Sequence, residues 1–158
     1  MIEITSLHPL FAAEVLGLDL GRALDSETLR LIEDAFARYS VLVFRDQDVT
    51  DEQQIAFSEH FGSLERTKVG TPGAGSPLVV LTNIGADGSI TSPTDKQILN
   101  NKANQHWHAD SSFKPVPAKA SMLSARIIPS KGGNTEYLSM RAAYAALPPA
   151  KQVAIEGL

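Results

Sequence analysis

The segment QHWHADSSF, residues 105–113, decides how this sequence is interpreted. Its centre holds His108 and Asp110, two residues apart. In an extended strand such residues project to the same face, so the imidazole and the carboxylate are expected side by side. This pair suits a divalent metal such as Fe(II), for which three protein ligands on one octahedral face leave three positions open. On its own, a His-x-Asp triplet is more often a surface hydrogen bond than a metal site.

The composition restricts which side chains could hold such a metal. The 158 residues include no cysteine, which excludes disulfides, thiolate-ligated zinc and iron–sulfur clusters. The net charge is −4 and the Lys and Arg residues form no stripe, so nucleic-acid binding is not expected. An acid, Glu3, stands where a signal peptide has bases, and no apolar run is long enough to span a bilayer. We therefore expect a cytoplasmic protein without a membrane partner.

Helix and strand signals precede this segment. Asp25 is a candidate N-cap of a helix that ends at Ser40. Its apolar face is formed by residues at helical spacing, namely Leu29, Ile32, Phe36 and Tyr39. The short apolar run at 41–44 predicts a buried strand. The capping box at 50–53 predicts a second helix that reaches about Phe61.

Strand signals dominate the second half of the chain. Strands are predicted at 78–81, 118–128 and 135–138. Ser139 then caps a last helix, whose buried side is expected to comprise Ala142, Ala143, Ala146 and Leu147. The Gly- and Pro-rich stretches 70–77 and 85–95 predict long loops of the kind that serve as lids or binding segments. Helices followed by strands indicate an α+β protein built on an antiparallel sheet or barrel.

Several motifs around the central segment occur together in a fixed order. Downstream they are WHAD at 107–110, the stretch 117–126, GGNTE at 132–136, MRAAY at 140–144 and ALP at 146–148. Upstream they are GLDL at 17–20, VFRDQ at 43–47 and FGSL at 61–64. In this order and spacing the sequence closely resembles the TauD/TfdA family, the taurine dioxygenase and 2,4-dichlorophenoxyacetate dioxygenase family. The stretches MLSA at 122–125 and TEY at 135–137 look nearer to the aryloxyalkanoate branch than to the taurine branch.

The resemblance implies a fold and a domain organisation. The family fold is a double-stranded β-helix, or jelly roll, with flanking helices. Residues 1–158 correspond to the N-terminal portion of a single such domain, so the mainly β core is expected to be incomplete in this chain. The family normally continues with a distal histidine ligand and an arginine that anchors 2-oxoglutarate. We therefore expect a fragment that is inactive by itself and that pairs with another copy, as a homo-oligomer, to cover its exposed strand edges.

The resemblance also implies site residues. His108 and Asp110 match two of the family's three iron ligands. Thr135 matches the residue that hydrogen-bonds 2-oxoglutarate, although a β-branched residue in a strand needs no such role. Asn104 falls where the taurine branch has a substrate-contacting asparagine, although a loop asparagine is often only a turn residue.

Three other polar side chains have chemistry that suits a binding pocket. Arg66 and Lys68 could pair with an anionic substrate group, the alternative being a solvated basic pair. His106 is interpreted as part of the pocket wall, since the family pattern assigns the metal to His108.

The implied activity is Fe(II)- and 2-oxoglutarate-dependent hydroxylation of a small anionic organic molecule, an aryloxyalkanoate or an alkylsulfonate. Dioxygen is consumed, and succinate and CO2 are released. One alternative is a catalytically inactive jelly-roll fragment that serves as a binding or assembly module. Another is a His/carboxylate metallohydrolase, against which the sequence offers no second metal-binding cluster and no HExxH helix.

Overall fold

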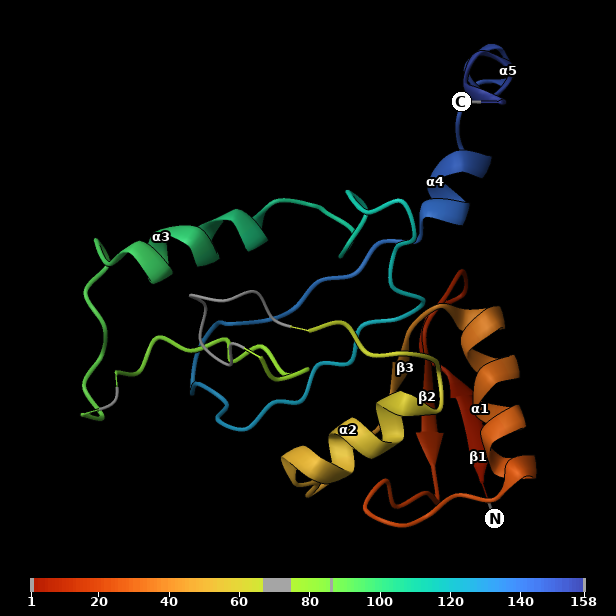
Figure 1. Ribbon diagram of the computed structural model, residues 1–158. Helices are drawn as coiled ribbons and strands as arrows, with labels where there is room; N and C mark the ends of the chain where they lie inside the picture. The colour runs from red at the N-terminus through yellow and green to blue at the C-terminus, as the bar shows by residue number, and fades with distance from the viewer. Residues whose placement is uncertain (1, 67–74, 86, 158) are drawn as a thin grey trace. The chain divides into compact units, whose positions relative to one another are not determined.

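The computed structural model describes residues 2–66, 75–85 and 87–157 (Figure 1). The chain divides into two compact units. Unit 1 comprises Met1–Thr50 and Ser124–Leu158, and unit 2 comprises Asp51–Leu123. The strands of the described sheet all belong to unit 1, whereas unit 2 consists of short helices and irregular segments.

Unit 1 contains a three-stranded sheet of order β1-β2-β3. β1 (Glu3–Ser6) runs antiparallel to β2 (Ala13–Leu16), with Ile4 opposite Val15. β3 (Leu42–Val43) runs parallel to β2 and lies within the strand predicted at 41–44. Ala13 and Val15, two residues apart on the central strand β2, are both buried.

Helix α1 (Ser26–Tyr39) lies beside this sheet in Figure 1. The Asp25 carboxylate accepts a hydrogen bond from the Thr28 amide at 2.7 Å, which confirms the predicted N-cap. Ser40 ends the helix at a φ of 64°, and its amide donates to the Phe36 carbonyl at 2.8 Å. Ile32, on the predicted apolar face, has no exposed surface. The expected helix is therefore confirmed at both ends.

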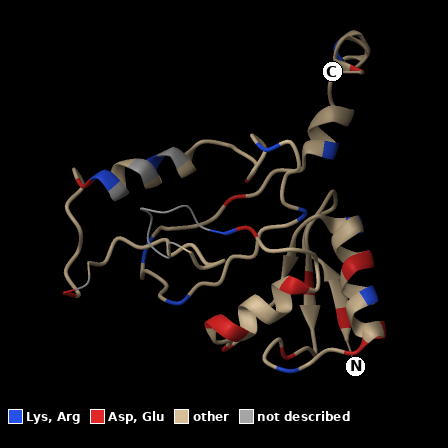
Figure 2. Ribbon diagram, viewed as in Figure 1, with Lys and Arg blue, Asp and Glu red and all other residues tan. Residues whose placement is uncertain are grey.

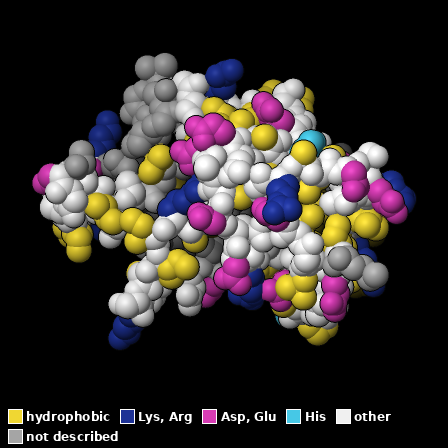
Figure 3. All heavy atoms as spheres, turned by 90° about the horizontal axis from the view of Figure 1, so that it is seen from below, with side chains coloured by type: hydrophobic (Ala, Val, Ile, Leu, Met, Phe, Trp, Pro, Cys, Tyr) yellow, Lys and Arg dark blue, Asp and Glu magenta, His cyan; other side chains and the backbone are white. Residues whose placement is uncertain are grey.

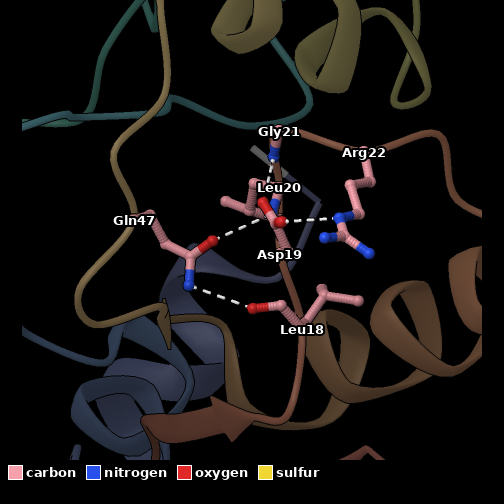
Figure 4. Close-up of polar contacts among 6 residues, drawn as sticks. All are labelled: Leu18, Asp19, Leu20, Gly21, Arg22 and Gln47. Atoms are coloured by element: carbon pink, nitrogen blue, oxygen red, sulfur yellow. Dashed lines mark hydrogen bonds and ion pairs between the residues drawn. The ribbon is translucent and has the colours of Figure 1, made fainter.

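A glutamine side chain links two early motifs (Figure 4). The Gln47 side-chain oxygen accepts from the Leu20 amide at 2.9 Å, and its nitrogen donates to the Leu18 carbonyl at 3.1 Å. Within the same turn, Asp19 pairs with Arg22 at 2.9 Å. Leu20 is thereby held in a buried position, at the point where the chain leaves β2 for α1.

The end of unit 1 carries two short helices, α4 (Met140–Ala145) and α5 (Pro149–Ile155). The buried Ser139 hydroxyl accepts from the Ala142 amide at 3.2 Å, as predicted for a cap. The predicted buried face is wrong in part: Ala146 is exposed, and α4 itself has no fully buried residue. Helical spacing groups side chains on one face, but burial needs a second element packed against that face.

Unit 2 begins with α2 (Asp51–Glu59), which starts directly after Thr50 as the capping box predicted. Phe57 is buried on this helix, and its ring meets that of Phe61 edge-on at 5.4 Å. Helix α3 (Lys96–Asn101) and the 3₁₀ turn η1 (Lys102–Gln105) follow in a region where the sequence predicts no helix.

The strands predicted at 78–81, 118–128 and 135–138 are not strands in the part of the chain that the structure describes. A strand requires a continuous main-chain ladder with a neighbouring strand. Among the described residues the three-stranded sheet is β1-β2-β3 and includes none of these segments, and the isolated bridge between Ile84 and Ile90 lies outside them. Many of their apolar side chains are exposed, and yellow apolar atoms are visible at the surface in Figure 3. The α+β class is confirmed, whereas a mainly β core is absent from the described residues.

Charge and hydropathy add two findings. Among the residues drawn in Figure 2, Lys and Arg are scattered between Asp and Glu rather than gathered in a stripe. No helix among the described residues has the length and apolar character that crossing a membrane requires.

Candidate functional site

His108 and Asp110 lie side by side in unit 2, shortly after η1. The His108 Nε2 atom is 3.5 Å from the Asp110 Oδ1 atom. Their predicted proximity is confirmed, but the backbone that carries them is not a strand. Ser111 follows with a φ of 56°, a left-handed conformation that turns the chain away from an extended path.

The His108 ring is oriented by the main chain. Its Nδ1 atom lies 2.8 Å from the His106 carbonyl oxygen. A carbonyl can only accept a hydrogen bond, so Nδ1 carries the proton and the neutral ring has its lone pair on Nε2. The Nε2 atom of the neutral ring and the Asp110 Oδ1 atom are both hydrogen-bond acceptors, and they lie 3.5 Å apart. A proton or a metal cation between these two atoms stabilises such an arrangement.

The two oxygens of Asp110 have different surroundings. Oδ2 accepts a hydrogen bond from the Ser121 hydroxyl at 2.6 Å, while Oδ1 is the atom near His108. The side chain is 59% exposed and that of His108 is 48% exposed, so an ion pair between them adds little to stability.

Glu65 fixes the turn that follows Asp110. Its Oε2 atom accepts from the Ser111 hydroxyl at 2.7 Å and lies 2.6 Å from the Lys114 ammonium. The hydrogen bond from Lys114, with that from Ser111, holds the pKa of Glu65 below its ordinary value of 4.5. The Lys114 amide also closes the turn onto the Ser111 carbonyl at 3.0 Å. The sequence does not predict these partners, because Glu65 and Ser111 are 46 residues apart and no local spacing signals the contact.

The donor atoms present fit a divalent metal. With metal–ligand bonds of 2.0–2.2 Å, two neighbouring donors are about 3.0 Å apart in an octahedral site and about 3.4 Å apart in a tetrahedral one. The observed separation of 3.5 Å is close to that range. One imidazole nitrogen and one carboxylate oxygen also suit a borderline cation such as Fe(II). Among the described residues, no three His, Cys, Asp or Glu side chains are grouped so that they could hold a metal ion, and the His108–Asp110 pair is two of the three side chains that the family pattern implies.

The remaining predicted site residues have separate surroundings. Arg66 donates to the Gly75 carbonyl at 3.0 Å. It also lines a cavity of about 580 Å³ in unit 2, together with Ile55, Glu59, Gly62, Ser63, Leu64 and Pro77. Lys68 lies outside the described residues, and Asn104 is exposed in η1. Thr135 belongs to unit 1, where it is exposed and lies outside any strand.

The sequence of this chain is similar to those of known dioxygenases. The family described as Taurine catabolism dioxygenase TauD, TfdA family matches residues 3–158. The chain is 45% identical over 157 residues to the alpha-ketoglutarate-dependent 2,4-dichlorophenoxyacetate dioxygenase of Cupriavidus pinatubonensis, covering 96% of this chain and 55% of that protein. It is 39% identical over 158 residues to the (S)-phenoxypropionate/alpha-ketoglutarate-dioxygenase of Sphingobium herbicidovorans, covering 99% and 51%.

A solved structure agrees with these relatives. The chain superposes on AAD-2 in complex with Mn(II) and N-oxalylglycine with a TM-score of 0.87 at 44% identity. The alignment covers 99% of this chain and 53% of that one. The chain thus spans about half the length of the curated relatives and of the solved structure that it matches.

Proposed function

This chain belongs to the TauD, TfdA family of dioxygenases, and on that premise we propose that the protein carrying it is an Fe(II)- and 2-oxoglutarate-dependent oxygenase. Its substrate is a small organic anion of the aryloxyalkanoate class, in preference to an alkylsulfonate. Relatives named for 2,4-dichlorophenoxyacetate and phenoxypropionate support this choice. Each turnover hydroxylates the substrate and converts 2-oxoglutarate and dioxygen to succinate and CO2.

One observation carries the proposal: the His108 Nε2 atom and the Asp110 Oδ1 atom converge at 3.5 Å. We assign these two atoms as iron ligands, with a third supplied from outside the described residues. The His106 carbonyl keeps the proton on Nδ1 of His108, so that Nε2 is free to bind metal. When bound, the metal coordinates 2-oxoglutarate and activates dioxygen.

Other residues have roles in this proposal that follow the family pattern. Thr135 hydrogen-bonds 2-oxoglutarate, and Asn104 contacts the substrate. Arg66 and Lys68 attract the substrate anion, a role that the position of Arg66 beside a cavity supports. The complete domain is a jelly roll, in which 118–128 and 135–138 become strands once their main-chain partners are present. Homo-oligomers and a cytoplasmic location remain part of the proposal.

Anaerobic titration of the whole protein with Fe(II), with and without 2-oxoglutarate, tests this function. We expect a cosubstrate-dependent visible absorption band from the iron. His108→Ala should abolish the band and weaken metal binding by more than about 100-fold, beyond the 10–100-fold typical of outer-shell changes. His60→Ala is the matched control, because His60 is an exposed histidine directly after α2. This variant should bind the metal as the wild-type protein does.

The outcomes separate the competing functions. Succinate formation coupled to an aryloxyalkanoate, and slower with an alkylsulfonate, supports the proposal in full. An iron spectrum indifferent to both 2-oxoglutarate and His108→Ala would refute the oxygenase function and favour a binding or assembly module.

A further inference from the structure

We infer that Ser121 is a positioning residue for the metal-binding carboxylate. Its hydroxyl holds one oxygen of Asp110, so that the other oxygen is presented to the metal beside His108. This inference rests on the proposed function, because it assumes that a metal binds at His108 and Asp110.

The contact has the geometry of a strong hydrogen bond. The Ser121 Oγ atom lies 2.6 Å from Asp110 Oδ2. Hydroxyl-to-carboxylate bonds in the range of 2.5–2.7 Å are charge-assisted and stronger than neutral ones. A serine hydroxyl has one proton to donate, and here it is directed at Asp110. Oδ1, the oxygen left over, is the atom 3.5 Å from His108 Nε2.

Holding Oδ2 matters because the carboxylate is otherwise mobile. The terminal torsion of aspartate is broad and roughly two-fold, so an unrestrained carboxylate exchanges its two oxygens freely. The Asp110 side chain is 59% exposed, and packing therefore does little to restrict it. With Oδ2 bound to Ser121, Asp110 offers one donor atom rather than two. The carboxylate then occupies a single coordination position, which leaves positions open for 2-oxoglutarate and dioxygen.

A purely structural role for Ser121 predicts a different result. Ser121 is itself exposed, and the contact joins two exposed side chains. Exposed polar contacts of this kind contribute little to folding, because water replaces the lost partner. Loss of the hydroxyl should therefore leave the metal-free protein as stable as before, while metal affinity falls.

The experiment measures Mn(II) binding to the metal-free whole protein by calorimetry, at a temperature where circular dichroism shows every variant folded. Ser121→Ala should weaken Mn(II) binding by roughly 10–100-fold, the usual effect of losing an outer-shell partner. Ser121→Thr keeps a hydroxyl, so its Mn(II) affinity should lie within about 3-fold of the wild-type affinity, in contrast with Ser121→Ala, which loses the outer-shell partner. Ser130→Ala, at an exposed serine of unit 1, is the matched control and should not change the affinity. The unfolding midpoint of the metal-free protein should be the same in all four proteins.

A wrong metal site and a wrong role for Ser121 would give different results. If wild-type Mn(II) binding is not lost in His108→Ala, the proposed metal site is wrong. If binding depends on His108 but Ser121→Ala leaves the affinity unchanged, or Ser121→Thr fails to restore it, the positioning role of Ser121 is overturned and the metal site stands.

Discussion

The sheet and helix of unit 1 and the site segment of unit 2, residues 105–123, are held together by different forces. In unit 1, β2 and α1 bury Ala13, Val15, Ile32 and Ala35. The site segment has no buried residue and is ordered by polar contacts from Glu65 and Ser121. Apolar burial is strong and insensitive to pH or salt, whereas exposed polar contacts are weak and sensitive to both. The two regions should therefore respond differently to the same kinds of change.

The largest expected effect lies in the core of unit 1. Ile32 is its largest fully buried side chain. Ile32→Ala removes apolar burial and leaves a cavity, so the free energy of unfolding should fall by about 2–5 kcal/mol. Denaturant unfolding followed by circular dichroism measures this loss.

The neighbouring leucine provides the matched control. Leu31 precedes Ile32 on the same helix but is 39% exposed. Leu31→Ala should lower the free energy of unfolding by less than about 1 kcal/mol. Equal losses for the two variants would mean that burial against the sheet does not hold α1, and the contrast between the regions would disappear.

A smaller effect is expected at α4, which belongs to unit 1 but has no buried residue of its own. Ser139→Ala removes the cap on the Ala142 amide and should lower the free energy of unfolding by about 0.5–2 kcal/mol. Amide exchange at Ala142 should accelerate, because the first turn of the helix loses its acceptor. Unchanged exchange at Ala142 would show that the cap contributes nothing, and that α4 is held in another way.

The smallest effect concerns acid pH at the site segment. The pKa of Glu65 is held below 4.5 by Lys114 and Ser111. A depressed folded-state pKa means that the stabilising contact is complete above 4.5 and is lost as pH falls through the lower, folded value. Fluorescence of Trp107, the single tryptophan, should therefore change in that acidic window in the wild type.

Two variants sharpen this test. Glu65→Gln has no carboxyl to titrate, so its acid-dependent fluorescence step should be missing. Glu59→Gln, at an exposed position at the end of α2, should retain the step. High salt should shrink the wild-type step by screening the Glu65–Lys114 pair. A step of equal size in Glu65→Gln would assign the acid response to another group.

Local chemistry explains which features could be predicted from the sequence. The starts of α1, α2 and α4 depend on residues within one turn, and all three were predicted, at Asp25, Thr50 and Ser139. Proximity of His108 and Asp110 followed from their spacing, although the backbone between them is not a strand. The order of the motifs pointed to the family, because motif order is a property of the sequence alone.

The features that escaped prediction depend on distant partners. Strands at 118–128 and 135–138 were expected from side-chain preference, but a strand forms only where another main chain accepts and donates its hydrogen bonds. Glu65 and Ser121 approach the turn around Asp110 from positions 46 and 11 residues away from their partners. No periodicity or spacing rule signals such contacts, which only the folded backbone creates.

Arg141 gives α1 a dependence on the order of protein synthesis. Its guanidinium donates to the Ala37 carbonyl at 3.0 Å, to the Arg38 carbonyl at 3.2 Å and to the Ser40 hydroxyl, residues made 101–104 positions earlier. A ribosome adds about 5–20 residues per second, so this interval corresponds to roughly 5–20 seconds of translation. Until Arg141 has been made, the Ala37 and Arg38 carbonyls lack this donor, and the end of α1 is held by the Ser40 cap without it.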